Sequence, residues 1–336
     1  MSSRKEKKRA NLRDVAAAAG VSVATVSRVL NSPNKVNEDT RERVQHSIDK
    51  LNFVPSAAAR AINSGRSRVV GALVTTLDNA IFARTLDALE NRLSDFGLSL
   101  IVATTEDDPE KETKKTRELL NIGVEGLIIT GVTHSPEMDA LINRWGIPAV
   151  AISYFDPDYY LPTIAYDNRA AAAVALNHLA DLSYNNIAVI HGPLASDRTR
   201  DRISCLKTAP SDISFKLFET EISISGGSKA VHEALNLNHG FDAFLCLSDV
   251  LATGVLFELQ RRSLTIPNDV AVMGLDDLPS SLVTCPRLST VRLPSQEMGL
   301  KAAEALGNWV EHDVRPDPLC LPTDLIVRES TQKQKS

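Results

Sequence analysis

Residues 11–31, NLRDVAAAAGVSVATVSRVLN, carry the pattern that most restricts what this chain can fold into. Asn11 precedes an apolar-rich stretch at 12–19, and Gly20 separates that stretch from a second one at 23–30. An asparagine in such a position can accept hydrogen bonds from the free amides of a first helical turn, and a glycine permits a tight turn. The pattern therefore predicts two short helices around a turn, a helix-turn-helix, which is typical of DNA-binding proteins.

The second predicted helix has one apolar and one polar face. Ser22 can cap it, and Val26, Val29 and Leu30 recur at helical spacing, where they can pack on the first helix. Short side chains on the other face would let the helix enter the major groove, and Arg28 could form two hydrogen bonds with a guanine edge. We expect DNA contacts from Ser22, Val23, Ala24, Thr25, Ser27, Arg28, Asn31 and Lys35.

A third helix is predicted after Asn37, with Val44, Ile48 and Leu51 on one face, so that three helices close a small core. A helical hairpin without a nucleic-acid role is the alternative, and the charge distribution argues against it. Residues 1–68 contain fourteen Lys and Arg but six Asp and Glu, whereas the rest of the chain contains twenty-three and thirty-six. Because a basic head attracts phosphates and an acidic body is repelled by them, only the head is expected to touch DNA.

Three stretches of the head, LRDVA at 12–16, AGVSVATVSRV at 19–29 and LNFVP at 51–55, occur together with a series of motifs in the body. The body motifs are GALV at 71–74, GLII at 126–129, IPAV at 147–150, Asp167-Asn168, SDVLATG at 248–254, VMGLDD at 272–277, PRLSTV at 286–291 and LIVRES at 325–330. Together they resemble the LacI/GalR family of bacterial transcription regulators over essentially the whole chain. The resemblance implies a DNA-binding head, a hinge helix and a body like that of periplasmic binding proteins.

Residues 55–66 form an alanine-rich stretch that begins with Pro55 and has Gly65 near its end. A helix of this length is not stable alone. The resemblance implies a hinge helix that folds when two copies meet on DNA, each inserting an apolar side chain into the minor groove. Ile62 occupies that position, where many relatives have leucine. A plain flexible linker is the alternative, although Arg60 and the neighbouring alanines would suit close approach to DNA.

The body alternates short apolar runs with amphipathic segments, the order expected of parallel strands joined by helices. The runs form one set at 69–74, 99–103, 126–130 and 149–152, and a second set at 186–190, 215–218, 243–247 and 270–274. Two sets over about 265 residues exceed what one core usually supports, so we predict an α/β fold with two lobes of parallel sheets flanked by helices. Ligands bind beyond the carboxyl ends of such strands, here in the cleft between the lobes.

Polar side chains suited to a carbohydrate follow several predicted strands. We expect the effector site to contain Asn79, Phe82, Ser153, Ser196, Arg202, Ser248 and Asp276. An arginine and a carboxylate can bind vicinal hydroxyls, and an aromatic ring can lie on the apolar face of a sugar. The resemblance implies that Arg202 and Asp276 are the effector-binding arginine and aspartate, and that the others except Ser196 occupy pocket-lining positions. Phe82 could instead be a core residue and Ser153 a solvent-facing one.

The sequence departs from the family pattern at three places. Cys205 stands where relatives commonly have glycine, Ser248 where asparagine is frequent, and Ser183-Tyr184 replaces a common Gly-His. The shorter side chain at Ser248 leaves room for a different substituent or a bridging water. None of the three changes the predicted fold, and the departures near Arg202 and at Ser248 bear on the identity of the effector.

Three arginines, Arg198, Arg200 and Arg202, alternate in the predicted cleft loop that follows the run at 186–190. Such a basic cluster would suit an anionic effector, for example a sugar acid or a sugar phosphate. Pairing with the two neighbouring aspartates on the surface is the alternative. The effector class that the sequence favours is a neutral-to-acidic carbohydrate.

The four cysteines, at positions 205, 246, 285 and 320, lack the paired spacing of a metal site, and we expect reduced thiols, no metal and no cofactor. An enzyme is not expected, because the sequence has no phosphate-binding glycine loop, HExxH motif or GxSxG elbow. No apolar run has the length of a membrane span, and no secretory signal is recognised. These features favour a cytoplasmic protein without membrane contact over an exported solute-binding protein.

Together these patterns predict a dimeric, ligand-responsive DNA-binding regulator, a repressor of genes for the uptake or catabolism of a carbohydrate-related compound. Two heads would read a pseudo-palindromic operator, and effector binding would change the angle between the lobes and release the DNA. A corepressor-type regulator that responds to a nucleobase or sugar phosphate is the alternative. The expected domains are a basic disordered tail at 1–10, the helix-turn-helix domain at 11–54, the hinge at 55–66, the effector-binding and dimerisation domain at 67–330 and a flexible tail at 331–336.

Overall fold

The computed structural model describes residues 10–31, 33–54, 65–237 and 239–333 of the 336-residue chain. By its internal contacts the chain divides into two compact units, Met1–Ser67 and Arg68–Ser336. Each unit has a hydrophobic core of its own. Most of the predicted N-terminal tail and residues 55–64 of the predicted hinge lie outside the described residues.

The first unit is built from three helices that begin at the predicted capping residues. The Asn11 side chain accepts hydrogen bonds from two amides of the first turn, and the Asp14 carboxylate accepts one from the Asn11 amide, which makes a capping box. Ser22 and Asn37 each accept a hydrogen bond from the amide three residues on, at 3.1 and 2.9 Å. Gly20 ends the first helix in the left-handed conformation. The elements are α1 (Leu12–Ala19), α2 (Val23–Asn31), η1 (Pro33–Lys35) and α3 (Glu38–Lys50).

The core of the head draws side chains from all three helices. Val26, Val29, Val44 and Ile48 are buried as predicted, whereas Leu51 is only partly buried. The buried set consists of Val15, Ala16, Ala19, Val26, Val29, Val44, Ile48 and Phe53. Because α2 packs through its valines, its opposite face stays available to solvent.

The second unit contains two six-stranded sheets, one in each lobe. The sheet of lobe 1 has the order β11-β5-β4-β3-β1-β2 and all its pairings are parallel. The sheet of lobe 2 has the order β12-β10-β9-β8-β6-β7, in which β12 pairs antiparallel with β10. The strands of lobe 1 are β1 (Val69–Val74), β2 (Ser99–Thr104), β3 (Gly126–Thr130), β4 (Ala149–Ile152), β5 (Thr163–Ala165) and β11 (Leu319–Cys320). Those of lobe 2 are β6 (Asn186–His191), β7 (Ser214–Glu219), β8 (Ala243–Cys246), β9 (Ala271–Asp276), β10 (Ser289–Arg292) and β12 (Asp324–Ile326).

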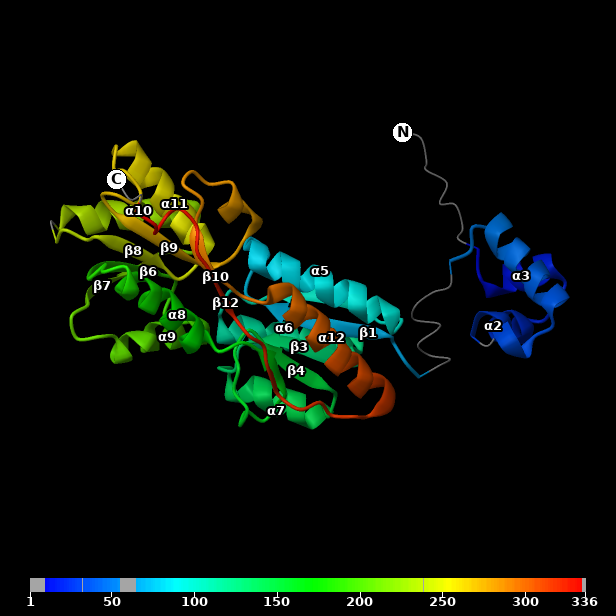
Figure 1. Cartoon of the computed structure of the whole chain (residues 1–336). Helices are drawn as coiled ribbons and strands as arrows, with labels where there is room; N and C mark the ends of the chain where they lie inside the picture. The colour runs from blue at the N-terminus through cyan, green and yellow to red at the C-terminus, as the bar shows by residue number, and fades with distance from the viewer. Residues whose placement is uncertain (1–9, 32, 55–64, 238, 334–336) are drawn as a thin grey trace, which may run out of the picture. The chain divides into compact units, whose positions relative to one another are not determined.

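Helices flank both sheets, and the chain passes between the lobes after β5, after β10 and between β11 and β12 (Figure 1). Lobe 1 has α5 (Ala80–Asp95), α6 (Pro109–Ile122), α7 (Pro136–Trp145) and α12 (Ser295–His312). Lobe 2 has α8 (Asn168–Asp181), α9 (Asp197–Ser204), η2 (Cys205–Thr208), α10 (Ile224–Asn236), α11 (Asp249–Arg261) and η3 (Pro279–Leu282). The helices α12 and α5 lie side by side, which Gly299 permits because a Cβ there would lie 2.5 Å from the Thr85 carbonyl oxygen.

The predicted fold class, a three-helix head followed by a two-lobed α/β body, is confirmed. All eight predicted apolar runs are strands whose bounds agree within two residues. The four strands without a predicted counterpart, β5, β10, β11 and β12, are two to four residues long. Strands of two or three residues carry too few side chains for a pattern to be recognised, and β10 (STVR), which is as long as β4 and β8, contains a single apolar residue.

Two local predictions are wrong. The segment at 196–202, expected to be a cleft loop, belongs mostly to α9, which begins at Asp197. Its composition is almost entirely polar, so it lacks the apolar stripe by which a helix is recognised. The C-terminal tail does not begin at Thr331, because that side chain is fully buried and its hydroxyl lies 2.9 Å from His178 Nε2 and 2.8 Å from Ser289 Oγ. A buried threonine gives no hydrophobic signal from which to predict this.

Among the described residues, none of the helices combines the length and the apolar character that crossing a membrane requires.

Candidate DNA-binding face and effector cavity

The exposed face of α2 carries most of the side chains predicted to contact DNA. Ser22, Val23, Ala24 and Arg28 are exposed, and Val23 has 41% of its surface accessible although it is apolar. Thr25 and Ser27 are partly buried and Lys35 is exposed just beyond the helix. The hydroxyl oxygens of Ser22 and Thr25 lie 2.9 Å apart at the start of the helix. The face is therefore narrow, with small residues at its N-terminal end and a cation near its C-terminal end.

Two of the predicted DNA contacts cannot be placed. Ile62 lies outside the described residues, together with most of the predicted hinge, and the side chain of Asn31 lies outside them as well. The minor-groove contact stays a prediction.

A cavity of about 280 Å³ lies between the two lobes of the body. The seven predicted effector-site residues, Asn79, Phe82, Ser153, Ser196, Arg202, Ser248 and Asp276, all line it. They come from both lobes and from positions up to about 200 residues apart in the chain, so their meeting in one place was not imposed by sequence proximity. The volume lies just below the usual range for ligand pockets, about 300–1,000 Å³, and fits a compact ligand.

The wall from lobe 1 combines an apolar patch with polar groups. Phe82 is 9% exposed and lies on α5, whose first residues are capped by Asn79 through a 3.3 Å hydrogen bond to the Ile81 amide. Ser153 follows β4 and is buried, and its carbonyl accepts a hydrogen bond from Asn168. Ser153 is therefore not solvent-facing, whereas Phe82 is buried as a core residue would be and also lines the cavity.

A carboxyl group forms the floor of the cavity on the lobe 2 side. Asp276, 3% exposed, accepts hydrogen bonds from the Ser248 hydroxyl at 3.1 Å and from the Asp249 amide at 3.2 Å. Burial and the negative charge of Asp249 raise the pKa of Asp276 to about 7, although the charge of Arg202 opposes this rise. Asp276 has a φ of 141°, a strained value for a residue with a side chain. A carboxyl whose pKa is raised toward neutral pH therefore lines the cavity.

The guanidinium of Arg202 is held firmly beside this floor. Its Nε donates to Asn168 Oδ1 at 2.9 Å, one Nη donates to the Leu247 carbonyl at 2.8 Å and the other to the Tyr166 hydroxyl at 3.4 Å. A guanidinium has five N–H donors, so these bonds within the described residues use three of them. The remaining two donors are available to hydroxyls of a ligand in the cavity.

The three alternating arginines do not form one basic cluster. On a helix, residues four apart share a face and a residue two positions on does not, so Arg198 and Arg202 line the cavity and Arg200 does not. Arg200 instead donates to the carbonyls of Leu194 and Ala195, at 2.8 and 2.6 Å. The prediction of a three-arginine cluster in the cleft is wrong for this reason.

Further cavity residues went unpredicted although they obey the rule that located the others. The segments after β1, β2 and β7 contribute Thr75, Asp78, Asp107, Glu221 and Ser223. Each follows the carboxyl end of a parallel strand, so applying the rule to every strand would have found them. No comparable signal existed for Met298, which reaches the cavity from α12.

The comparisons with known proteins cover both units of the chain. Residues 11–56 match the family of bacterial regulatory proteins, lacI family, and residues 67–329 match the periplasmic binding proteins and sugar binding domain of the LacI family. The ribose operon repressor of Halalkalibacterium halodurans is 30% identical over 96% of this chain and 97% of its own, and the transcriptional repressor PurR of Actinobacillus pleuropneumoniae is 27% identical over 96% and 98%. The crystal structure of a LacI-family regulator from Silicibacter pomeroyi has a TM-score of 0.86 at 26% identity and covers 96% of this chain and 100% of that one. The chain belongs to the LacI family of bacterial regulatory proteins.

Proposed function

We propose that the protein is a homodimeric repressor that binds a pseudo-palindromic operator and releases it when a small neutral carbohydrate enters the cavity between the lobes. The observation that carries this proposal is the cavity lining, which combines the Arg202 guanidinium, a donor, with the Asp276 carboxyl, an acceptor whose pKa responds to the Arg202 charge. In this proposal the protein has a regulatory and not a catalytic role, and it acts in the cytoplasm, where the operator is.

The polar and apolar groups of the cavity suit a sugar. Vicinal hydroxyls both accept and donate, so one can accept from Arg202 while its neighbour donates to Asp276. Ile81, Phe82 and Ile222 supply apolar surface for the C–H face of a pyranose or furanose ring. The match of residues 67–329 to a sugar-binding domain supports the same ligand class.

The charges around the cavity favour a neutral ligand over an anionic one. Arg198 is paired with carboxylates of Asp107 and Asp197, at 3.0 and 3.1 Å, so its charge is already compensated. The lining also includes Asp78 and Glu221, whose carboxylates would repel an acid or phosphate. This narrows the expectation from the sequence, which included sugar acids.

A homodimer would place two heads on one operator, which a single short recognition helix needs in order to read enough base pairs. Surface apolar groups on lobe 2 support a second copy. Phe257, Leu282 and Val283 are exposed, the last by 82%, and Gln260 donates to the Cys285 carbonyl, which brings α11 next to the segment after η3. Apolar side chains exposed together in this way are typical of interaction surfaces.

The decisive experiment titrates complexes of the purified protein and operator-like DNA, at fixed salt, with neutral sugars, sugar acids, sugar phosphates and nucleobases. One neutral sugar is expected to release the DNA, while its acid and phosphate counterparts at the same concentration do not. Release by anions alone would overturn the neutral class, and tightening would make the protein a corepressor-dependent regulator. Absence of any sequence-specific DNA binding would overturn the regulatory role itself.

Effector affinity is expected to rise about tenfold between pH 6 and pH 8, because the pKa of Asp276 in the free protein is about 7. A sugar hydroxyl that donates to Asp276 stabilises the carboxylate and lowers this pKa, so binding releases a proton and is favoured above the free-state pKa. Isothermal titration in buffers of different ionisation enthalpy measures that proton. The Asp276→Asn variant should bind weakly and without pH dependence. An affinity that falls with rising pH would show that the ligand accepts from a protonated Asp276.

A further inference from the structure

The first turn of α9, in lobe 2, makes direct polar contacts with lobe 1. One carboxylate oxygen of Asp197 accepts hydrogen bonds from the backbone amides of Val132 and Thr133, at 2.8 and 3.1 Å. These two amides belong to the segment that follows β3. Asp197 is 8% exposed, so water screens these bonds little.

The next residue, Arg198, makes a second contact between the lobes. One Nη donates to Asp107 Oδ1 at 3.0 Å and to Thr75 Oγ1 at 3.1 Å, and the other donates to the second carboxylate oxygen of Asp197 at 3.1 Å. Thr75 also donates to Asp107 at 3.0 Å. The buried Asp197 and Arg198 thus form one connected network with Asp107. This network joins the loops after β1, β2 and β3 to α9.

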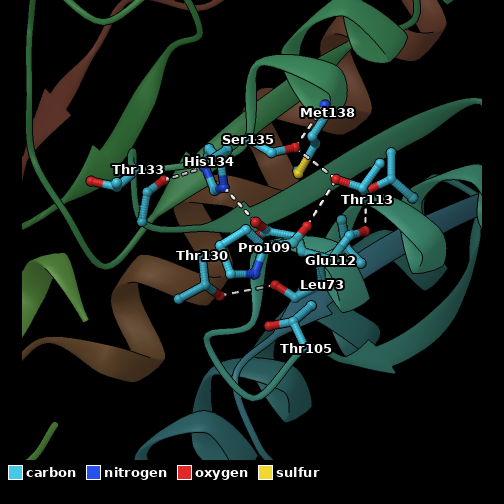
Figure 2. A network of polar contacts seen from close by, with 12 residues as sticks. Leu73, Thr105, Pro109, Glu112, Thr113, Thr130, Thr133, His134, Ser135 and Met138 are labelled. Carbon is cyan, nitrogen blue, oxygen red and sulfur yellow. Dashed lines mark hydrogen bonds and ion pairs between the residues drawn. The ribbon is translucent and has the colours of Figure 1, made fainter. Parts of the chain in front are cut away.

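Lobe 1 is shaped to receive Asp197. Gly131 has a φ of 85°, and a Cβ there would lie 2.6 Å from the Asp197 carboxylate, so only glycine leaves the space. Behind it, the His134 ring lies 3.2 Å from the Gly131 carbonyl oxygen and 3.0 Å from Glu112 Oε2 (Figure 2). Ser135 and Thr113, whose hydroxyls are 2.7 Å apart, tie the same segment to α6. The receiving loop is therefore fixed by contacts inside lobe 1.

We propose that Asp197 and Arg198 are positioning residues of the effector response, forming a latch that holds the lobes together before the effector arrives. The latch adjoins the effector cavity, since Thr75, Asp107 and Arg198 line that cavity while Asp197 does not. The latch proposal rests on the proposed function, because it takes the cavity as the effector site. The effector then binds lobes that are already in the arrangement it requires, and its apparent affinity depends on the fraction of molecules that are latched.

Replacing Asp197 tests the latch without changing a residue that lines the effector cavity. In the Asp197→Ala variant the Val132 and Thr133 amides lose their acceptor and Arg198 loses one carboxylate, so the latched fraction falls. Asp197→Asn keeps an oxygen for the amides and loses only the charge, so it should behave in between. The control is Asp201→Ala, which changes a partly buried carboxyl one turn later on α9.

Distances between spin labels test the latch in the full-length protein without DNA or effector. Labels go on Lys114→Cys in α6 and Lys229→Cys in α10, both exposed, with the exposed Cys285 and Cys320 changed to serine. With the labelled protein diluted in excess unlabelled protein, so that only distances within one protomer are measured, electron–electron resonance should give one narrow distance for the otherwise unchanged protein and for Asp201→Ala, and a broader, longer distribution for Asp197→Ala. Identical narrow distributions in all variants would overturn the latch. This outcome does not depend on whether the proposed effector is right.

Operator affinity is the second readout, because it would not change if Asp197 had only a structural role. Without effector, Asp197→Ala should change operator affinity at least threefold, in the direction opposite to the change that the effector causes, because the effector and the latch favour the same arrangement. Effector affinity should fall about tenfold, which is about 1.4 kcal/mol. Unchanged affinities, or a shift in the same direction as the effector's, would overturn the proposal. Failure of every protein form to bind operator would instead count against the proposed function.

Discussion

Replacement of Arg202 by alanine is expected to abolish the response to effector while operator affinity in its absence stays within about threefold. The guanidinium provides the free donors at the cavity floor, and hydrogen bonds from charged groups contribute about 1.5–3 kcal/mol each. Its positive charge also opposes the rise in the pKa of Asp276, so its loss favours the neutral acid at the floor. Together these losses should weaken effector binding about 100-fold or more. Anisotropy of labelled operator DNA, titrated with the effector, measures both quantities.

Two controls make this result specific to the cavity. Arg202→Lys keeps the charge but cannot make the bonds to Asn168 and Leu247 together, so it should recover only part of the response. Arg261→Ala removes an arginine from lobe 2 whose side chain is 80% exposed and should respond like the unchanged protein. If the Arg202→Ala variant responds at unchanged effector concentrations, Arg202 does not belong to the site.

Features that depend on near neighbours in the chain were predictable. The caps of the head helices join residues three apart, so Asn11, Ser22 and Asn37 could be identified from their spacing alone. Eight of the strands were located by their apolar runs, and the rule that ligands bind beyond their carboxyl ends brought seven chosen side chains to one cavity. Periodicity and topology therefore carried the fold and the place of the site.

Features that depend on distant partners were not predictable. Arg198 was interpreted as part of an anion-binding cluster because nothing in the sequence shows that Asp107, 91 residues earlier, compensates it. Thr331 was assigned to a tail because its partners His178 and Ser289 are 153 and 42 residues away. In both cases the side chain is polar and its burial is decided by a partner, whereas pattern reading recognises burial only through apolar character.

The difference between near and distant partners explains why the family can be recognised from the sequence, whereas the effector class requires the three-dimensional structure. The family resemblance rests on motifs of consecutive residues, which the chain itself displays. The proposed effector class depends on which charges in the cavity are already paired, and Arg198 is paired with both Asp107 and Asp197. The three-dimensional pairing of charges, not their number in the sequence, therefore supports the neutral ligand.

Replacement of Arg28 by alanine is expected to weaken binding to the preferred operator by about 1–3 kcal/mol and to relax specificity at one base pair of each half-site. Arg28 is exposed near the C-terminal end of α2, on the face opposite the buried Val26 and Val29. From there a guanidinium can donate two hydrogen bonds to the O6 and N7 of a guanine. Binding to a set of operators in which every base is changed in turn measures the loss at each position. Non-specific DNA should be bound almost as before.

The salt dependence distinguishes a base contact from a phosphate contact. A phosphate-binding arginine releases a counterion, so its loss would lower the slope of log affinity against log salt by about 0.9, whereas loss of a base contact leaves the slope unchanged. Arg43→Ala provides the control, because it removes an exposed arginine of α3 that was not predicted to contact bases. If Arg28→Ala weakens every operator variant equally and lowers the slope, Arg28 binds the backbone, and sequence recognition by α2 must come from its small residues at the N-terminal end.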